Sequence, residues 1–454
     1  MEMLRLGAGA GFAGDRFDPA VALAAHAQLH ALIFEVLAER TIALAQRRCL
    51  SGQGPGYDQR LAERIGSVLA LALRQRTQIV TNGGAADPTA AGLMVQDLAR
   101  QYALPCRIAT VTGDDVLDRL DLDTAIVLET GEPLAHYRDR IVSANAYLGI
   151  APLLEALAAK PDVLITGRTS DVALFLAPLV HAFGWAADDW RLLAAGSVVG
   201  HLLECAGQLT GGYFADGRRK QVPSLARLGF PYAEVSADGR AIVTKLPNTG
   251  GRIDRATCLE QLLYEVEDPA RYLTPDVVVD FRQVQIETVG VDRVQISGAQ
   301  GYPAPETLKV SVGIDGGFVG VGEISYAGPG CLARARLAAD IIGQRWVEVY
   351  GYDPGDIAES LIGLTSSTPW RSIRDSRMVE PPEVRLRLAV QSLDRQVPLD
   401  LVHEVEALYT NGPAGGGGVE VHVRDTIAVL STLIPRGVVQ PRVQLLEVAP
   451  RSYH

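Results

Sequence analysis

The sequence predicts an α/β protein whose N-terminal half is a doubly wound, mostly parallel sheet, followed by a second, α+β domain. Three observations predict this architecture. Short apolar runs alternate with helix-forming segments from residue 4 to about residue 185. Most runs end in Gly with Asn, Asp or Glu, as strands of a parallel sheet do at their carboxyl ends. From Asp276 the pattern changes to alternating strands. We expect residues 1–275 to carry the site and residues 276–454 to form the second domain.

Composition limits the partners of the chain. Its 454 residues are 48% hydrophobic and 21% charged, with a net charge of -11. This balance lacks the basic footprint that nucleic acids and anionic membranes require. The longest uncharged stretch, Val172 to Ala187, is shorter than the ~20 apolar residues of a membrane span. Scattered cysteines and no signal-peptide pattern fit a cytoplasmic protein, and the acidic surface is compatible with a homo-oligomer.

The first half divides into elements by apolar periodicity. The expected strands are Leu4–Leu6, Ala31–Phe34, Ile79–Thr81, Arg107–Val111, Ala125–Leu128 and Val163–Ile165. A stripe of apolar residues at four-residue spacing from Leu61 to Leu73 predicts a helix packed on the sheet. Further helices are expected after Asp18-Pro19, after Asp87-Pro88, over Val172–Phe183 and over Leu193–Gln208.

The loop after the first strand has two features of a dinucleotide site. Gly9 to Gly14 fit G-x-G-x-x-G, and Glu35 follows at the fingerprint's spacing. However, Asp18-Pro19 starts the helix after the glycines, and Asp15 puts negative charge where a phosphate would bind. A tight turn, a dinucleotide loop and a binding loop of another kind therefore remain open. For the last of these, the expected substrate-binding residues are Gly11, Asp15 and Arg16.

The later strand ends carry further polar candidates. Backbone N–H groups of Asn82-Gly83-Gly84 can hold a carboxylate or phosphate, unless the segment is a plain turn. Glu39 can enter the cleft or lie on a solvated helix face. The turn after Val163–Ile165 supplies Asp171 as a candidate acid/base group. The remaining expected substrate-binding residues here are Asn145, Arg168 and Ser170.

A mid-chain helix carries His201, Glu204 and Cys205 among apolar neighbours. Such polar groups are costly to bury unless they are paired. An acid/base cluster, a structural polar pair and a metal site are all compatible with the spacing, although no further ligand pair supports a metal. Thr210 and Gly211 follow in the same stretch and are candidates for substrate binding.

In the second half, the expected elements are strands at Val277–Phe281, Thr307–Val312 and Val384–Leu388 and a helix over about 332–349. The glycine-rich segment from Tyr409 to Gly418 predicts either a loop that closes over a ligand or a flexible connection.

Several long motifs together resemble the acyclic terpene utilisation A (AtuA-like) family. They are Gly11–Arg16, Glu39–Thr41, Asn82–Gly84, Gly167-Arg168, Gly200–Cys205, Gln261–Val266 and Asn411–Pro413. The resemblance covers nearly the whole chain and implies a place in terpenoid catabolism through coenzyme A thioesters. Longer members carry a small C-terminal module that is not found before His454, so the resemblance implies nothing about an activity that needs this module, whether or not another chain supplies it.

These observations lead to one main hypothesis and two alternatives. The main one is an enzyme of the hydratase or lyase type, acting on a branched acyl-CoA or carboxylate, with Glu204 as acid/base group, His201 orienting it and Asp171 as the second candidate. The alternatives are an NAD(P)-dependent oxidoreductase and a non-catalytic acyl-CoA-binding protein. No cofactor or metal is expected beyond coenzyme A as part of the substrate.

Overall fold

The structure is a computed structural model that describes residues 3–365 and 380–449. By packing, the chain divides into a first unit, which runs to Gly313 and resumes at Val429, and a second unit, Ile314–Ala428. The domain boundary expected at 275/276 stays a prediction. Each unit is described by itself below.

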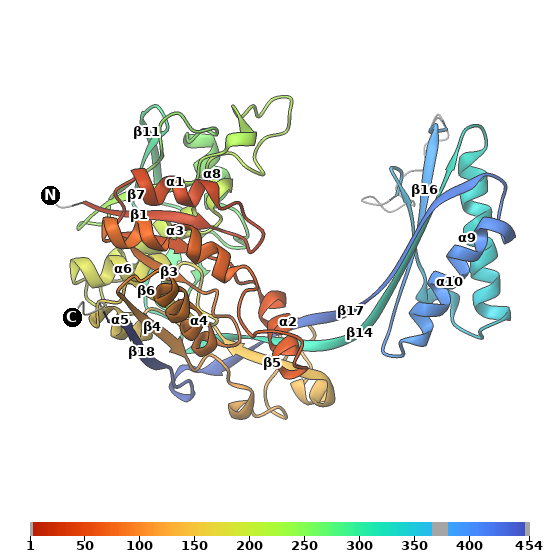
Figure 1. Cartoon of the computed structure of the whole chain (residues 1–454), viewed down its shortest axis with the longest axis horizontal. Coiled ribbons are helices and arrows are strands. Elements are labelled where there is room, and N and C mark those ends of the chain that lie inside the picture. Colours follow the sequence, from red (N-terminus) through yellow and green to blue (C-terminus); the bar gives the residue numbers. More distant parts are fainter. Residues whose placement is uncertain (1–2, 366–379, 450–454) are drawn as a thin grey trace. The chain divides into compact units, whose positions relative to one another are not determined.

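A 10-stranded sheet forms the centre of the first unit (Figure 1). In order along the sheet, the parallel strands are β1 (Met3–Ala10), β2 (Ala31–Phe34), β3 (Gln78–Thr81), β6 (Val163–Thr166) and β4 (Cys106–Thr112). Beyond β1 lie the antiparallel strands β7 (Pro231–Ser236), β8 (Ala241–Lys245), β12 (Arg293–Ser297) and β11 (Gln285–Gly290). At the other edge, β18 (Arg442–Val448) pairs antiparallel with β4. The sheet is thus mixed, with a parallel centre, because later parts of the chain add hairpins to one edge and the final strand to the other.

Two groups of helices cover this sheet. In one group, α3 (Leu61–Gln75) packs against both α1 (Asp18–His26) and α4 (Pro88–Gln101). The other consists of α5 (Ala151–Ala158), α6 (Ala173–Phe183) and α7 (Trp190–Leu203). Burial by helices explains why strands such as β3 and β6 are continuous apolar runs: Val80 and Leu164 are fully buried.

Smaller elements complete the first unit. Helix α2 (Glu39–Leu50) packs against β5 (Ile141–Ala146), and α8 (Arg255–Leu262) packs against α7. A separate sheet consists of β13 (Gln300–Tyr302), β10 (Val278–Asp280) and β9 (Tyr272–Leu273).

The parallel strands end in register. Phe34 lies opposite Thr81, and Thr81 lies opposite Ile165. The residues that follow β2, β3 and β6 therefore meet at one edge of the sheet, as the sequence predicted.

Two expected elements differ from the structure. Ala125–Leu128 is an irregular segment with only an isolated bridge from Ile126 to Pro133, so that strand prediction is wrong. The helix expected over Leu193–Gln208 ends at Leu203, with Glu204 as its C-cap. Cys205, which the sequence placed on the same helix as His201, consequently lies beyond it.

The second unit has the order strand, helix, two strands, helix, strand. Its elements are β14 (Thr307–Ala327), α9 (Cys331–Glu348), β15 (Ala358–Ile362), β16 (Glu383–Ser392), α10 (Gln396–Asn411) and β17 (Gly416–Pro435), of which β14 begins and β17 ends in the first unit. The sheet order β15-β16-β14-β17 makes this a split β-α-β arrangement. It has its own core around the buried Trp346. The expected loop at Tyr409–Gly418 is largely the end of α10 and the start of β17.

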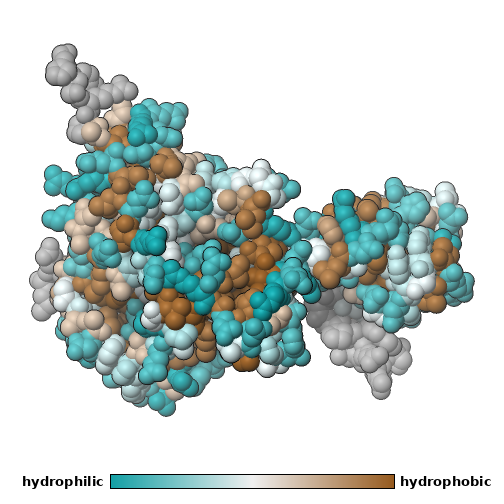
Figure 2. Space-filling model, turned by 90° about the horizontal axis from the view of Figure 1, so that it is seen from below, coloured by the Kyte–Doolittle hydropathy of each residue, from teal (hydrophilic) through white to brown (hydrophobic). Residues whose placement is uncertain are grey.

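Figure 2 shows patches of hydrophobic residues surrounded by hydrophilic ones. Within the described residues, no helix combines the length and apolar character needed to cross a membrane. Some aromatic side chains are nevertheless well exposed, including Phe12 at 67% and Tyr213 at 85%.

Candidate functional site

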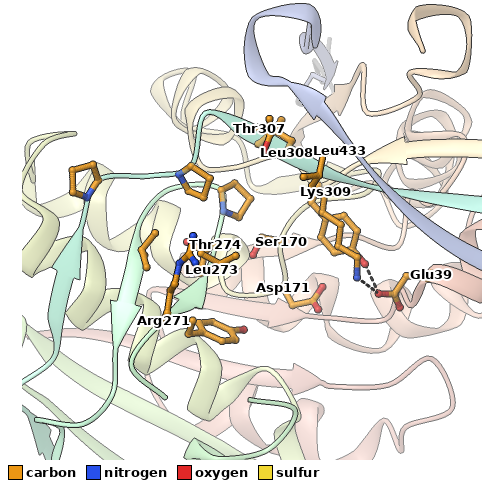
Figure 3. A pocket seen from close by; sticks show the side chains of 16 residues that line it. Glu39, Ser170, Asp171, Arg271, Leu273, Thr274, Thr307, Leu308, Lys309 and Leu433 are labelled. Atoms are coloured by element: carbon orange, nitrogen blue, oxygen red, sulfur yellow. Dashed lines mark hydrogen bonds and ion pairs between the residues drawn. The ribbon is translucent and has the colours of Figure 1, made fainter. Parts of the chain in front are cut away.

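A cavity of about 550 Å³ lies in the first unit and includes the turn that follows β6 (Figure 3). This volume falls in the range of small-molecule sites. Its lining residues come from parts of the chain that are far apart in sequence. They are Glu39, Tyr147, Ser170, Asp171, Arg271, Tyr272, Leu273, Thr274, Pro275, Val278, Pro303, Pro305, Thr307, Leu308, Lys309 and Leu433.

Asp171 is held in this cavity by Arg168. The Nη2 atom of Arg168 donates to Oδ1 of Asp171, whose side chain is 39% exposed, whereas the Arg168 side chain is 1% exposed. Nη1 of Arg168 donates to the carbonyl of Leu37 at 2.5 Å, and Nε and Nη2 donate to the carbonyl of Thr169 at 3.1 and 2.8 Å. Each guanidinium nitrogen thus has a protein acceptor, and Arg168 lies behind the cavity wall.

The protonation of Asp171 is balanced near neutrality. Removal from water raises the pKa of Asp171 to about 7, the charge of Arg168 opposes this, and the charges of Glu204 and Glu39 add to it. A carboxyl group with such a pKa can both accept and donate a proton at neutral pH.

Beside Asp171, Glu39 forms a second, ionised carboxylate. Tyr147 donates its hydroxyl to Oε1 of Glu39 at 2.5 Å, and Nζ of Lys309 lies 3.4 Å from the same atom (Figure 3). Burial raises the pKa of Glu39, but these partners and Arg168 outweigh it and lower the pKa to about 2. The two carboxyl groups of the cavity are therefore held in different protonation states.

The rest of the cavity is mainly apolar, with one further cation. Prolines and leucines form much of its wall. In the view of Figure 3, Arg271 and Thr274 lie across from Glu39, with Asp171 between them. A wall of this kind suits an apolar group, while Arg271 and Lys309 suit an anion.

His201 and Glu204 form a buried pair that does not line this cavity. Nδ1 of His201 lies 2.8 Å from Oε1 of Glu204, and Nε2 lies 3.2 Å from the carbonyl of Leu262. Since a carbonyl only accepts, Nε2 carries hydrogen. Oε2 of Glu204 is buried without a hydrogen-bond partner among the described residues. The His201 ring packs against Tyr272 at 5.1 Å, and Tyr272 in turn lines the cavity.

The segment Asn82–Gly84 is buried, and several of its hydrogen-bonding groups are already paired with other groups of the protein. Asn82 accepts from the backbone of Val36 at 2.8 Å and donates to Glu35 at 2.9 Å. The N–H of Gly83 donates to Thr81. Burial, together with the charge of Asp171, raises the pKa of Glu35. These residues support the edge of the sheet and do not line the cavity.

Asn145 has a similar supporting position. Its Nδ2 donates at 3.0 Å to Oδ2 of Asp114, and that oxygen also accepts the backbone N–H of Arg168 at 2.9 Å. Burial raises the pKa of Asp114 to about 6. Asn145 and Asp114 thus orient the turn that carries Asp171.

The glycine-rich loop after β1 lies at another cavity. Gly11, Asp15 and Arg16 line it, and the N–H of Gly11 donates to Oδ2 of Asp15 at 2.8 Å. A carboxylate therefore already occupies the acceptor position beside this glycine. Thr210 is buried nearby and donates to the carbonyl of Gly207; Gly211, with a φ of 104°, forms the adjoining turn.

The predicted residues thus separate into distinct groups. Glu39, Ser170 and Asp171 line the larger cavity, Arg168 braces it, and His201 and Glu204 reach it through Tyr272. Sequence reasoning missed Tyr147, Arg271, Tyr272 and Lys309. Tyr147 could have been found from its position two residues after Asn145, in a segment already singled out for its polar residues. Arg271, Tyr272 and Lys309 lie in ordinary loop and strand sequence without a motif.

Among the described residues, no group of three or more His, Cys, Asp and Glu side chains has an arrangement that could hold a metal ion.

Comparison with known proteins identifies the family. The family model described as "Acyclic terpene utilisation family protein AtuA" matches residues 4–445. The searches of curated proteins and of solved structures returned no match. Because the match spans nearly the whole sequence, both units included, the chain belongs to the acyclic terpene utilisation AtuA family.

Proposed function

We propose that this protein is an enzyme that adds or removes a proton, and with it water or a carbon fragment, on a branched acyl-CoA or related carboxylate. The observation that carries the proposal is Asp171: a carboxyl group in a cavity of about 550 Å³, fixed by a buried arginine, with a pKa of about 7. Membership of a terpene utilisation family supports a branched, apolar substrate.

Asp171 takes the acid/base role in this proposal. Hydration, dehydration and lysis of an acyl thioester each need a proton transfer beside the carbonyl, and Asp171 is the cavity carboxyl group that can exchange one near pH 7. Glu39 stays ionised and keeps Lys309 and Tyr147 in place. Glu204 acts through its charge on Asp171, so its predicted role as the proton-transferring group passes to Asp171.

The substrate would lie with its apolar branches against the proline and leucine wall. Arg271, whose side chain has no hydrogen bond or ion pair among the described residues, would bind an anionic group of the substrate. Ser170 offers a hydroxyl group to a carbonyl, whereas the hydroxyl of Thr274 already donates to the carbonyl of Val277 at 2.7 Å.

The oxidoreductase alternative has less support. A dinucleotide pyrophosphate would need the backbone N–H groups of the loop after β1, but Gly11 already donates to Asp15. The α1 helix begins at Asp18, after the glycines, so its N-terminus is not part of that turn.

The proposal is tested by screening purified protein against branched, saturated and unsaturated acyl-CoA thioesters, with products analysed by mass spectrometry. Wild type should convert at least one branched thioester. Asp171→Asn should lose turnover by at least about 100-fold, the usual size of an acid/base contribution, while retaining binding. The matched control is Asp97→Asn, because Asp97 lies on the exposed surface of α4. Binding without conversion by wild type would instead identify a carrier protein.

A further inference from the structure

The second cavity, at the loop between β1 and α1, has the features of a separate ligand site. Its volume is about 430 Å³, and it shares no lining residue with the cavity of Asp171. Its walls include Gly11, Phe12, Asp15, Arg16, Gln208 and Tyr213. Backbone contacts fix one side, because a Cβ at Gly11 would lie 2.4 Å from the backbone of Cys205.

Phe12 presents an aromatic ring to this cavity in a constrained position. The ring is 67% exposed, yet it lies over Gly14, where an added Cβ would come within 2.4 Å of Cε1 of Phe12. Gly14 therefore provides room for the ring. Phe12 therefore offers an exposed aromatic ring at the wall of the cavity.

Tyr213 presents a second ring, and its backbone is strained. The side chain is 85% exposed, and φ is 61°, in the left-handed region that non-glycine residues rarely adopt. It contacts only the edge of Tyr264, at 6.3 Å between ring centroids, among the aromatic contacts of the described residues. Glycine adopts this conformation without steric cost, so Tyr213 can be replaced by glycine without straining the backbone.

Polar groups also line this cavity. Asp15 is half-buried, and its carboxyl group accepts the N–H of Gly11, at Oδ2, and that of Phe12. Gln208 lines the cavity and also hydrogen-bonds Tyr264. Arg16 is tied to the carbonyls of Leu225 and Ala226 through Nη1 at 3.2 and 3.3 Å. A carboxylate and an amide suit a ring that carries an amino donor beside a ring-nitrogen acceptor.

We propose that this cavity binds a planar heterocycle with an exocyclic amino group, and specifically an adenine ring, stacked against Phe12 and Tyr213 and hydrogen-bonded by Asp15 and Gln208. Stacking on aromatic side chains is the general way in which proteins hold a base. The inference does not depend on the proposed reaction, because none of these residues touches the Asp171 cavity.

The test is saturation-transfer NMR and calorimetry with adenosine as the probe and uridine as the comparison. Wild type should bind adenosine more tightly than uridine. Tyr213→Gly should weaken adenosine binding about tenfold or more, the effect of losing one stacking ring. Its melting temperature should stay equal or rise, because glycine relieves the left-handed strain. Phe12→Leu should weaken binding similarly while keeping an apolar side chain over Gly14.

Tyr102→Ala removes an exposed aromatic ring outside this cavity and should leave binding unchanged. Three adenine compounds then separate the sources of the ring. If coenzyme A binds more tightly than adenosine, the adenine ring belongs to coenzyme A or its thioesters. Tighter binding of NADH would instead indicate a dinucleotide, and tighter binding of AMP a free nucleotide. Absence of adenosine binding to wild type, or equal binding by wild type, Tyr213→Gly and Phe12→Leu, would overturn the proposal.

Discussion

Asp171 reaches into the larger cavity while the guanidinium to which it is bonded, that of Arg168, is buried behind it. The arginine ties three structures together: the carbonyl of Leu37 after β2, its own turn after β6, and the carboxyl group in the cavity. A change at Arg168 should therefore affect both the fold and the site.

We expect Arg168→Lys to destabilise the protein by about 3 kcal/mol or more, because a lysine cannot supply the fork of donors and leaves buried carbonyls unpaired. Urea unfolding checks this. Arg100→Lys is the matched control: Arg100 pairs with Asp97 on the surface, where the loss should be below about 0.5 kcal/mol. Equal free energies of unfolding for the two variants would show that the hydrogen bonds of Arg168 do not stabilise the fold.

Asp114→Asn should make stability less dependent on pH. Burial raises the pKa of Asp114 from 3.8 to about 6, so the folded state binds this proton more tightly than the unfolded state. The resulting stabilisation is complete below about pH 4 and is lost as pH rises through 6, by up to about 3 kcal/mol for two pKa units.

Asparagine can keep both hydrogen bonds that Oδ2 of Asp114 accepts, from Arg168 and from Asn145. Urea unfolding between pH 4 and 7.5 should therefore show a smaller fall in stability for the variant than for wild type. Parallel curves would contradict the assigned shift.

Gly84→Ala tests the close packing of the β3 loop on β6. A Cβ at Gly84 would lie 2.6 Å from the carbonyl oxygen of Thr166, a backbone atom that cannot turn away. We expect a loss of about 1–3 kcal/mol in the free energy of unfolding. Gly54→Ala, with nothing within 4 Å of the added carbon, should change it by less than about 0.5 kcal/mol.

Much of this framework could be predicted from sequence. The apolar runs Ala31–Phe34 and Val163–Ile165 correspond to β2 and to most of β6. Strands that are buried on both faces appear in the sequence as short, continuous apolar runs, which made them visible. Asp18-Pro19 correctly placed the start of α1, and Asp87 caps α4 through the N–H of Ala90.

Other features depend on contacts that no local pattern contains. The antiparallel strands at both edges of the sheet join segments up to several hundred residues apart, such as β18 and β4. Arg271 and Lys309 enter the cavity from loop and strand sequence without a motif. Glycine and polar residues at strand ends predicted the edge of the sheet at which the candidate cavity lies. They did not predict which polar side chains hydrogen-bond within the protein, as Asn82 does with Val36 and Glu35.

Glu204→Gln should lower the pKa of Asp171, because the negative charge of Glu204 is one of the influences that raise it. When kcat/KM for a thioester substrate is measured against pH, the part of the curve that reports the titration of Asp171 should move to lower pH. Asp97→Asn, remote from the cavity, should leave that part of the curve in place. An unchanged curve in Glu204→Gln would show that the charge of Glu204 does not influence the pKa of Asp171.

The acid/base role of Asp171 is tested most directly by the pH dependence of kcat/KM for wild type and Asp171→Glu on one branched thioester, with Asp171→Asn as the inactive reference. Wild type should show a limb near pH 7, matching the pKa of about 7 for Asp171, and the glutamate variant should retain a weaker activity with a displaced limb. Turnover by Asp171→Asn at the wild-type rate, with the same profile, would contradict the role assigned to this carboxyl group.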